Sequence, residues 1–180
     1  IQAESEKGKG TTFTIRLHFE AASAESAAPE AAAGAPGESL SGRSILLCED
    51  NALNREISTA LLKEKNMRVD TAENGKEGVQ KFLDSAPGTY DAILMDIRMP
   101  VMDGLEAAKR IRLSDRPDAG SVPILAMTAD TFSDDIQNCL DAGMNGHLAK
   151  PVDPEQLYRK LQSVIGSKRE SPARPGRAAV

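Results

Sequence analysis

Five polar side chains follow or end short apolar runs at four places in the sequence. Runs of this length are typical of buried strands. If the strands are parallel, their carboxyl ends meet at one edge of the sheet, so the polar groups lie close together. The set contains three carboxylates, one hydroxyl and one ammonium: Glu49 and Asp50 after SILLC (44–48), Asp96 after YDAILM (90–95), Thr128 after VPILAM (122–127), and Lys150 at the end of GHLAK (146–150).

This combination of groups predicts a site for a phosphoryl group. Three converging carboxylates repel one another unless a cation joins them, and Mg²⁺ suits two carboxylates, a backbone carbonyl and remaining positions for water or phosphate. An ammonium neutralises phosphoryl oxygens, a hydroxyl donates a hydrogen bond to them, and a carboxylate can act as the nucleophile. Asp96 is the candidate nucleophile because it projects alone from the central apolar run.

Each of these residues also has a structural interpretation. A carboxylate after a strand is often the N-cap of the next helix, and Asp50 or Asn51 could cap the first one. Thr128 could cap the fourth helix, and Lys150, which precedes Pro151, could be a solvated loop residue. Taken singly, these interpretations are favoured, whereas the convergence of all the groups favours a functional site.

The residues around the predicted strand ends exclude three other classes of phosphate-binding protein. Phosphatases of the haloacid-dehalogenase type require D-x-D, but the sequence from Asp96 to Arg98 places arginine at the second position. A P-loop requires GxxxxGK[ST] after the first strand, whereas ENGKEG (73–78) has a different spacing and follows the second. A flavin-binding relative needs a Ser/Thr/Gly-rich loop where this sequence reads EDNALN (49–54).

The segment from Arg43 to about Gly166 alternates apolar runs with amphipathic stretches, and MRVDTA (67–72) adds a fifth predicted strand. The last helix has Asp153 as its N-cap and Pro154 as its first residue. Five such units predict an α/β fold: a doubly wound, five-stranded parallel sheet with helices on both faces. The apolar positions at helical spacing are Leu53, Ile57, Ala60 and Leu61; Val79, Phe82 and Leu83; Leu105, Ala108 and Ile111; Ile136, Cys139 and Leu140; and Leu157, Leu161, Val164 and Ile165.

The rest of the chain has a different composition. Residues 1–19 predict a terminal β-hairpin, because TTFTIRLHF (11–19) alternates apolar and polar residues after a glycine turn. Residues 20–42 are rich in Ala, Ser, Glu, Gly and Pro and predict a flexible linker. Residues 167–180, SKRESPARPGRAAV, predict a disordered tail after a domain that spans residues 43–166.

Composition also argues against several functions. The formal net charge of -5 gives no support to nucleic-acid binding. No apolar run approaches the length of a membrane span and IQAESEKGKG (1–10) lacks a signal-peptide apolar region, so we expect a cytoplasmic segment without membrane contact. Cys48 and Cys139 lie far apart without a CxxC pattern, which predicts two buried thiols rather than a disulfide or a zinc site.

Four motifs carry a family resemblance, and they occur in the order LLCEDN (46–51), LMDIRMPVMDG (94–104), LAMTAD (125–130) and LAKPVD (148–153). On these motifs, residues 43–166 resemble the receiver domain of two-component response regulators. The resemblance implies a flavodoxin-like fold with strand order 2-1-3-4-5.

The resemblance also implies a role for each polar residue. Asp96 would accept a phosphoryl group from a histidine of a kinase or phosphotransfer partner. Lys150 would pair with the phosphoryl oxygens, and Thr128 would move to bond the phosphorylated aspartate, which switches the face formed by the fourth helix, fifth strand and fifth helix. The Mg²⁺ ligands would be Asp50, Asp96, the backbone carbonyl of Arg98, and Glu49 through water.

The N-terminal sequence carries a second resemblance. SEKGKGTTF (5–13) is similar to the S-x-x-G-x-G-T-x-F pattern before the terminal strand of a histidine-kinase ATP-binding domain. We therefore expect the chain to be the C-terminal part of a hybrid sensor histidine kinase, without the kinase's nucleotide-binding or phosphodonor elements.

An alternative function is a receiver-fold docking module, which would bind a kinase or phosphotransfer protein without phosphoryl turnover. Degenerate receivers usually lose an acidic or lysine position, and this sequence retains all of them, which favours the phosphoacceptor. One position departs from the family: His147 stands three residues before Lys150, where an aromatic residue is usual.

Overall fold

The computed structural model describes residues 2–6, 8, 10–14, 39–129 and 133–167. The chain forms two compact units, Ile1–Ala35 and Pro36–Val180. Most of the predicted linker, the end of the predicted strand at 15–19 and nearly all of the predicted tail lie outside the described residues. Among the described residues, no helix has the length and apolar content needed to cross a bilayer.

The first unit contains an antiparallel hairpin. Its strands are β1 (Gln2–Glu6) and β2 (Gly10–Thr14), and the register pairs Gln2 with Thr14 and Glu6 with Gly10. Gly8 and Gly10 have positive φ angles of 88° and 109°, which glycine adopts without steric cost. A hairpin is therefore present in residues 2–14, and its origin in a kinase domain stays a prediction.

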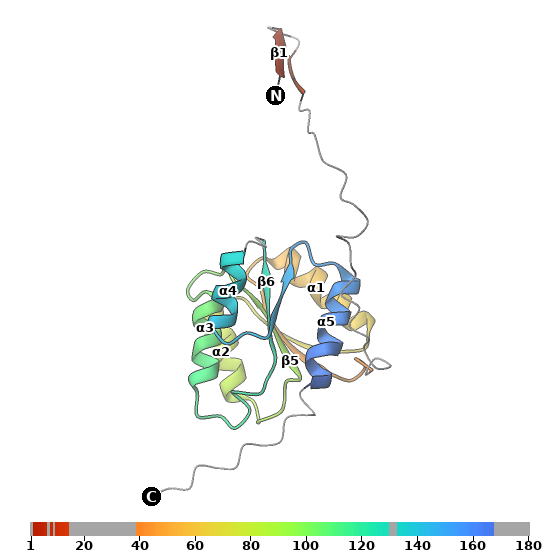
Figure 1. Ribbon diagram of the computed structural model, residues 1–180. Coiled ribbons are helices and arrows are strands. Elements are labelled where there is room, and N and C mark those ends of the chain that lie inside the picture. The colour runs from red at the N-terminus through yellow and green to blue at the C-terminus, as the bar shows by residue number, and fades with distance from the viewer. Residues whose placement is uncertain (1, 7, 9, 15–38, 130–132, 168–180) are drawn as a thin grey trace, which may run out of the picture. The chain divides into compact units, whose positions relative to one another are not determined.

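The second unit is built on the predicted five-stranded parallel sheet (Figure 1). The strand order is β4-β3-β5-β6-β7, which is 2-1-3-4-5 when the strands of this unit are counted along the chain. The prediction of a doubly wound fold with this order is confirmed. The strands are β3 (Ser44–Cys48), β4 (Arg68–Ala72), β5 (Ala92–Asp96), β6 (Ile124–Thr128) and β7 (Gly146–Ala149).

Helices cover both faces of this sheet. α1 and α5 lie on one face, and α2, α3 and α4 lie on the other (Figure 1). Successive side chains of β5 enter different cores: Ile93 packs with α2 and α3, whereas Leu94 packs with α1 and α5. This two-sided burial explains why the three inner strands, β3, β5 and β6, read as continuous apolar runs. The helices are α1 (Ala52–Glu64), α2 (Gly75–Asp84), α3 (Gly104–Leu113), α4 (Ser133–Asp141) and α5 (Pro154–Ser167).

Helix caps decide one of the alternatives left open by the sequence. The side chain of Asn51 accepts hydrogen bonds from the backbone N–H groups of Leu53 and Asn54, so Asn51 and not Asp50 caps α1. Asp50 therefore remains available for another role. The predicted cap of α5 is confirmed, because Gln156 N–H donates to Asp153 Oδ1 at 2.8 Å.

The buried face of α1 differs from the apolar stripe in the sequence. Leu53 and Ile57 are 65% and 50% exposed, and the helix buries Ser58 and Leu62 against the sheet. Leu61 is half-buried in the same core. Because α1 carries apolar residues around more than one side, spacing alone does not reveal which side faces the sheet.

Candidate phosphoryl site at the strand ends

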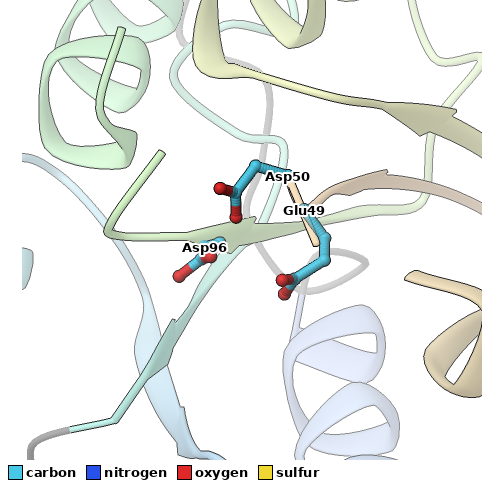
Figure 2. A group of neighbouring side chains, drawn as sticks. All are labelled: Glu49, Asp50 and Asp96. Carbon is cyan, nitrogen blue, oxygen red and sulfur yellow. The ribbon is translucent and has the colours of Figure 1, made fainter. Parts of the chain in front are cut away.

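The three predicted acids converge at the carboxyl ends of β3 and β5 (Figure 2). Asp96 is the last residue of β5, and Glu49 and Asp50 directly follow β3. Glu49 and Asp96 are buried, whereas Asp50 is exposed. Carboxylate oxygens of the three residues lie within 4.8 Å of one another. Such a set of hard oxygen donors fits Mg²⁺, which prefers carboxylates and water.

Lys150 joins two of these acids. Its ammonium donates to Glu49 Oε2 at 2.6 Å and forms an ion pair with Asp96 Oδ2 at 2.8 Å. The backbone N–H of Lys150 donates to the carbonyl of Thr128 at 2.8 Å, and this bond fixes the lysine backbone directly after β7. The interpretation of Lys150 as a solvated loop residue is therefore wrong.

Burial and charge act in opposite directions on this pair. Burial, together with the negative charge of Glu49, raises the pKa of Asp96 above its ordinary value, although the hydrogen bond and charge of Lys150 lower it. Burial lowers the pKa of Lys150, but the hydrogen bonds and charges of Asp96 and Glu49 raise it by more. The ammonium therefore keeps its proton at neutral pH and supplies a permanent positive charge beside Asp96.

Thr128 ends the neighbouring strand at the same edge. Thr128 is buried. It pairs with Ala149 of β7, and the residue before it, Met127, pairs with Asp96 of β5. α4 begins only at Ser133, so Thr128 does not occupy the N-cap position next to that helix. The structure thus places the hydroxyl-bearing residue where the sequence predicts it.

The turn after Asp96 is held close to the carboxylate. The backbone N–H of Arg98 donates to Asp96 Oδ1 at 3.2 Å. The N–H of Gly104 donates to the carbonyl of Ile97 at 2.9 Å, and the Gly104 backbone approaches the Asp96 carbonyl so closely that a Cβ would collide with it. Glycine at this position lets α3 start directly beside the candidate nucleophile.

His147 occupies the second position of β7 and pairs with Ala126. Its side chain is half-buried. Burial, followed by the positive charge of Lys160, lowers the pKa of His147 below its ordinary value of 6.5. The lowered pKa favours the neutral imidazole.

Sequence reasoning missed two residues of α1 that contact the acidic pair. Asn54 donates from Nδ2 to Glu49 Oε1 at 3.2 Å, and Arg55 donates to the carbonyls of Glu49 and Asp50. The signal was present in the sequence. Once Asn51 caps the helix, the first turn of α1 lies over the end of β3 and brings positions 54 and 55 back to it.

Comparison with known proteins decides the family. The model of the response regulator receiver domain matches residues 45–162. The chain belongs to this family. This receiver domain is 36% identical over 137 residues to probable histidine kinase 5 of Oryza sativa subsp. japonica, a match that covers 66% of the chain and 11% of the relative. Hybrid signal transduction histidine kinase I of Dictyostelium discoideum is 32% identical over 131 residues, which cover 72% of the chain and 8% of the relative.

Solved receiver domains have the same fold. The receiver domain of sensor histidine kinase PA1611 from Pseudomonas aeruginosa PAO1, solved with a magnesium ion in its active-site cleft, is 42% identical with a TM-score of 0.63 and covers 70% of this chain and 99% of that chain. The receiver domain of Saccharomyces cerevisiae Ssk1, solved with the histidine phosphotransfer protein Ypd1, is 30% identical with a TM-score of 0.62. The match covers 71% of this chain and 92% of that chain. The chain spans about a tenth of the length of the curated kinases it matches.

Proposed function

We propose that residues 43–166 are the phosphoacceptor domain of a phosphorelay and that Asp96 takes a phosphoryl group from a histidine of a partner protein. The observation that carries this proposal is the ion pair of Asp96 with Lys150 at 2.8 Å, with Glu49 and Asp50 beside it. A carboxylate at the tip of a buried strand is fixed for attack, and the ammonium neutralises incoming phosphoryl oxygens.

The transfer is a displacement at phosphorus. An oxygen of Asp96 forms the new P–O bond, the P–N bond to the histidine breaks, and the imidazole leaves with the electron pair of that bond. Mg²⁺, when bound, supplies positive charge that neutralises the phosphoryl oxygens. Lys150 orients the Asp96 carboxylate before transfer and holds phosphoryl oxygens after it. The residues that would hold Mg²⁺ are Glu49, Asp50, Asp96 and the backbone carbonyl of Arg98.

Phosphorylation replaces the Asp96 carboxylate, with its charge of -1, by an acyl phosphate that carries about -1.5 to -2, so the strand ends become more negative by about 0.5 to 1. The Lys150 ammonium, which is shared between Glu49 and Asp96, then has a stronger anionic partner. Thr128 donates its hydroxyl to the phosphorylated aspartate. Both residues border α4, β7 and α5, so we assign the switched surface to these three elements.

A histidine-bearing protein partner is supported by the surface beside the site. Leu53 and Ile57 lie one helical turn apart at the exposed start of α1, directly after the acidic pair. Val101, in the turn after Asp96, is 80% exposed and has a φ of 69°, a costly conformation for a β-branched residue. Contiguous exposed apolar patches that are rimmed by polar residues mark protein contacts, and these three side chains are candidates for one. The solved complex of a relative with a phosphotransfer protein agrees with such a partner.

The receiver domain belongs, in this proposal, to a hybrid histidine kinase that works in the cytoplasm. Two observations support this assignment. The curated relatives reported above are histidine kinases, and SEKGKGTTF (5–13) resembles a hairpin of a kinase domain. Its partners are a histidine kinase or a histidine phosphotransfer domain, and neither nucleic acid nor membrane is a partner of this segment.

Incubation of the full chain with Mg²⁺ and a small phosphoramidate tests the proposal. Intact-mass spectrometry should show one labile phosphoryl group on the wild type and on Asp84→Asn, which changes an exposed acid at the end of α2. Asp96→Asn should take none. A phosphoryl group that persists on Asp96→Asn would contradict the assignment.

Beryllofluoride separates the phosphoacceptor from the docking module. Added with Mg²⁺, it mimics an acyl phosphate on a reactive carboxylate, so amide resonances near Thr128 and His147 should shift in the NMR spectrum of the wild type. A protein that only docks a partner would bind the phosphotransfer protein without showing these shifts.

A further inference from the structure

Arg55, on the first turn of α1, reaches back over the end of β3. Its guanidinium NH1 donates to the carbonyl of Glu49 at 2.8 Å and to the carbonyl of Asp50 at 3.1 Å. Its NH2 forms an ion pair with Glu73 Oε1 at 2.9 Å. The arginine side chain is 17% exposed although it carries a full charge, whereas the Glu73 side chain is 68% exposed. One guanidinium therefore joins three groups from two strand ends.

The two carbonyls lie where the sheet ends. Glu49 N–H still donates to the carbonyl of Ala72 at 3.0 Å, which is the last step of the pairing between β3 and β4. The carbonyls of Glu49 and Asp50 project beyond this ladder, and polar backbone groups near a core require partners. Arg55 supplies them, and two bonds from one planar group fix the orientation of both peptide planes.

The two acids depend on this bond to different degrees. The Glu49 carboxylate is also held directly, by Lys150 at Oε2 and by Asn54 at Oε1. Asp50 is exposed, and none of the described hydrogen bonds reaches its carboxylate, so the backbone is the part of this residue that is held. That backbone is fixed on one side by the Asn51 cap and on the other by the bond from Arg55 to the Asp50 carbonyl.

The charge of Arg55 is balanced within the same cluster. A guanidinium near a cation site repels the cation, and the Glu73 carboxylate at 2.9 Å reduces this repulsion. Among the described hydrogen bonds, the Arg55 guanidinium donates to the backbone of the acidic pair and to the Glu73 carboxylate, and none of its bonds goes to the carboxylates of Glu49 or Asp50. The arginine thus orients the acids without neutralising them.

We propose that Arg55 is a positioning residue for Mg²⁺: by fixing the backbone of Glu49 and Asp50, it sets the affinity of the acidic cluster for the ion, with Glu73 as its counter-charge. This inference rests on the Mg²⁺ site of the proposed function. Partners that orient metal ligands without touching the metal usually change its affinity by about 10-fold or more when they are removed.

The test measures the Mg²⁺ dissociation constant of the full chain by NMR titration of the amides of residues 49, 50 and 96. The variants are Arg55→Ala, Arg55→Lys and the matched control Arg43→Ala, which removes an ion pair with Asp91 near the opposite end of β3. Thermal unfolding in the presence of a chelator gives the stability of each variant. Titrations are made at a temperature at which every variant is folded.

Arg55→Ala should weaken Mg²⁺ binding roughly 10-fold. Arg55→Lys keeps the charge but cannot bridge two carbonyls and Glu73, so it should recover stability more than it recovers affinity. Arg43→Ala should lose stability with no change in affinity. Wild-type affinity in Arg55→Ala, or an equal loss in Arg43→Ala, would overturn the proposal.

Failure of this inference is distinguishable from failure of the proposed function. If Arg55 variants bind Mg²⁺ like the wild type while Asp96 still accepts a phosphoryl group, only the role of Arg55 is wrong. If the Arg55 variants lose affinity while the wild type takes no phosphoryl group, the positioning role stands and the phosphoacceptor assignment fails.

Discussion

The ammonium of Lys150 lies 2.8 Å from Asp96 Oδ2, and this ion pair joins the ends of two strands that are not neighbours in the sheet. β6 lies between them and ends at Thr128, whose carbonyl accepts the backbone N–H of Lys150 at 2.8 Å. Lys150 therefore contacts the candidate nucleophile through its ammonium and the end of β6 through its backbone, directly after the edge strand β7. We expect a change of charge on Asp96 to act first on the Lys150 ammonium.

Lys150→Ala leaves Glu49 and Asp96 as two buried carboxylates without their shared cation. We expect a loss of about 3 kcal/mol in the free energy of unfolding when Mg²⁺ is absent, and a partial recovery when Mg²⁺ is added. Urea denaturation with and without Mg²⁺ measures both effects. Lys109→Ala, which removes an exposed lysine of α3, is the control and should change neither. Equal stability of Lys150→Ala and wild type without Mg²⁺ would refute the prediction.

Gly104→Ala places a methyl group against the carbonyl of Asp96. Backbone atoms on both sides must move, so the free energy of unfolding should fall by about 1–3 kcal/mol and the turn after Asp96 should shift. Chemical denaturation and the amide resonance of Arg98 report the two effects. Gly120→Ala is the matched control, because a Cβ there meets no atom within 4 Å. An unchanged free energy of unfolding in Gly104→Ala would contradict the close approach of the Gly104 backbone to the Asp96 carbonyl.

His147 should titrate below its ordinary value, because burial and then the charge of Lys160 lower its pKa in the folded state. The unfolded state then binds the proton more tightly. The contribution of His147 to stability is complete above the unfolded pKa of about 6.5 and is lost as the pH falls through the folded pKa. Histidine NMR resonances, assigned with His147→Phe, measure the pKa directly.

The same linkage predicts a difference between two stability curves. Between about pH 7 and pH 5 the wild type should lose more stability than His147→Phe, because the variant has no group to protonate at this position. A folded pKa of His147 above 6.5, or parallel stability curves, would contradict the cause given for the shift.

The fold and the main site residues followed from the sequence because each depends on local patterns. Apolar runs with two-sided burial predict parallel strands, and the carboxyl ends of such strands meet at one edge. That rule by itself predicts that Asp96, Thr128 and Lys150 lie together. The structure adds the distances that make Lys150 a partner of Glu49 as well as of Asp96.

The remaining features depend on contacts that spacing does not specify. The choice between Asp50 and Asn51 as the cap of α1 is set by the backbone angles at the end of β3, and both side chains suit a cap. The exposed position of Leu53 depends on how α1 rotates against the sheet. The place of Arg55 near the end of β3 follows once Asn51 is known to cap α1, but spacing does not specify which carbonyls its guanidinium contacts.

The most direct test of the phosphoacceptor assignment locates the phosphoryl group itself. The chain is treated with Mg²⁺ and a phosphoramidate and then with borohydride, which reduces an acyl phosphate to an alcohol, and the peptides are sequenced by mass spectrometry. We predict that Asp96 alone is converted to homoserine and that Asp96→Asn shows no conversion. Conversion at Glu49 or Asp50, or a stable phosphoryl group on His147, would contradict the account.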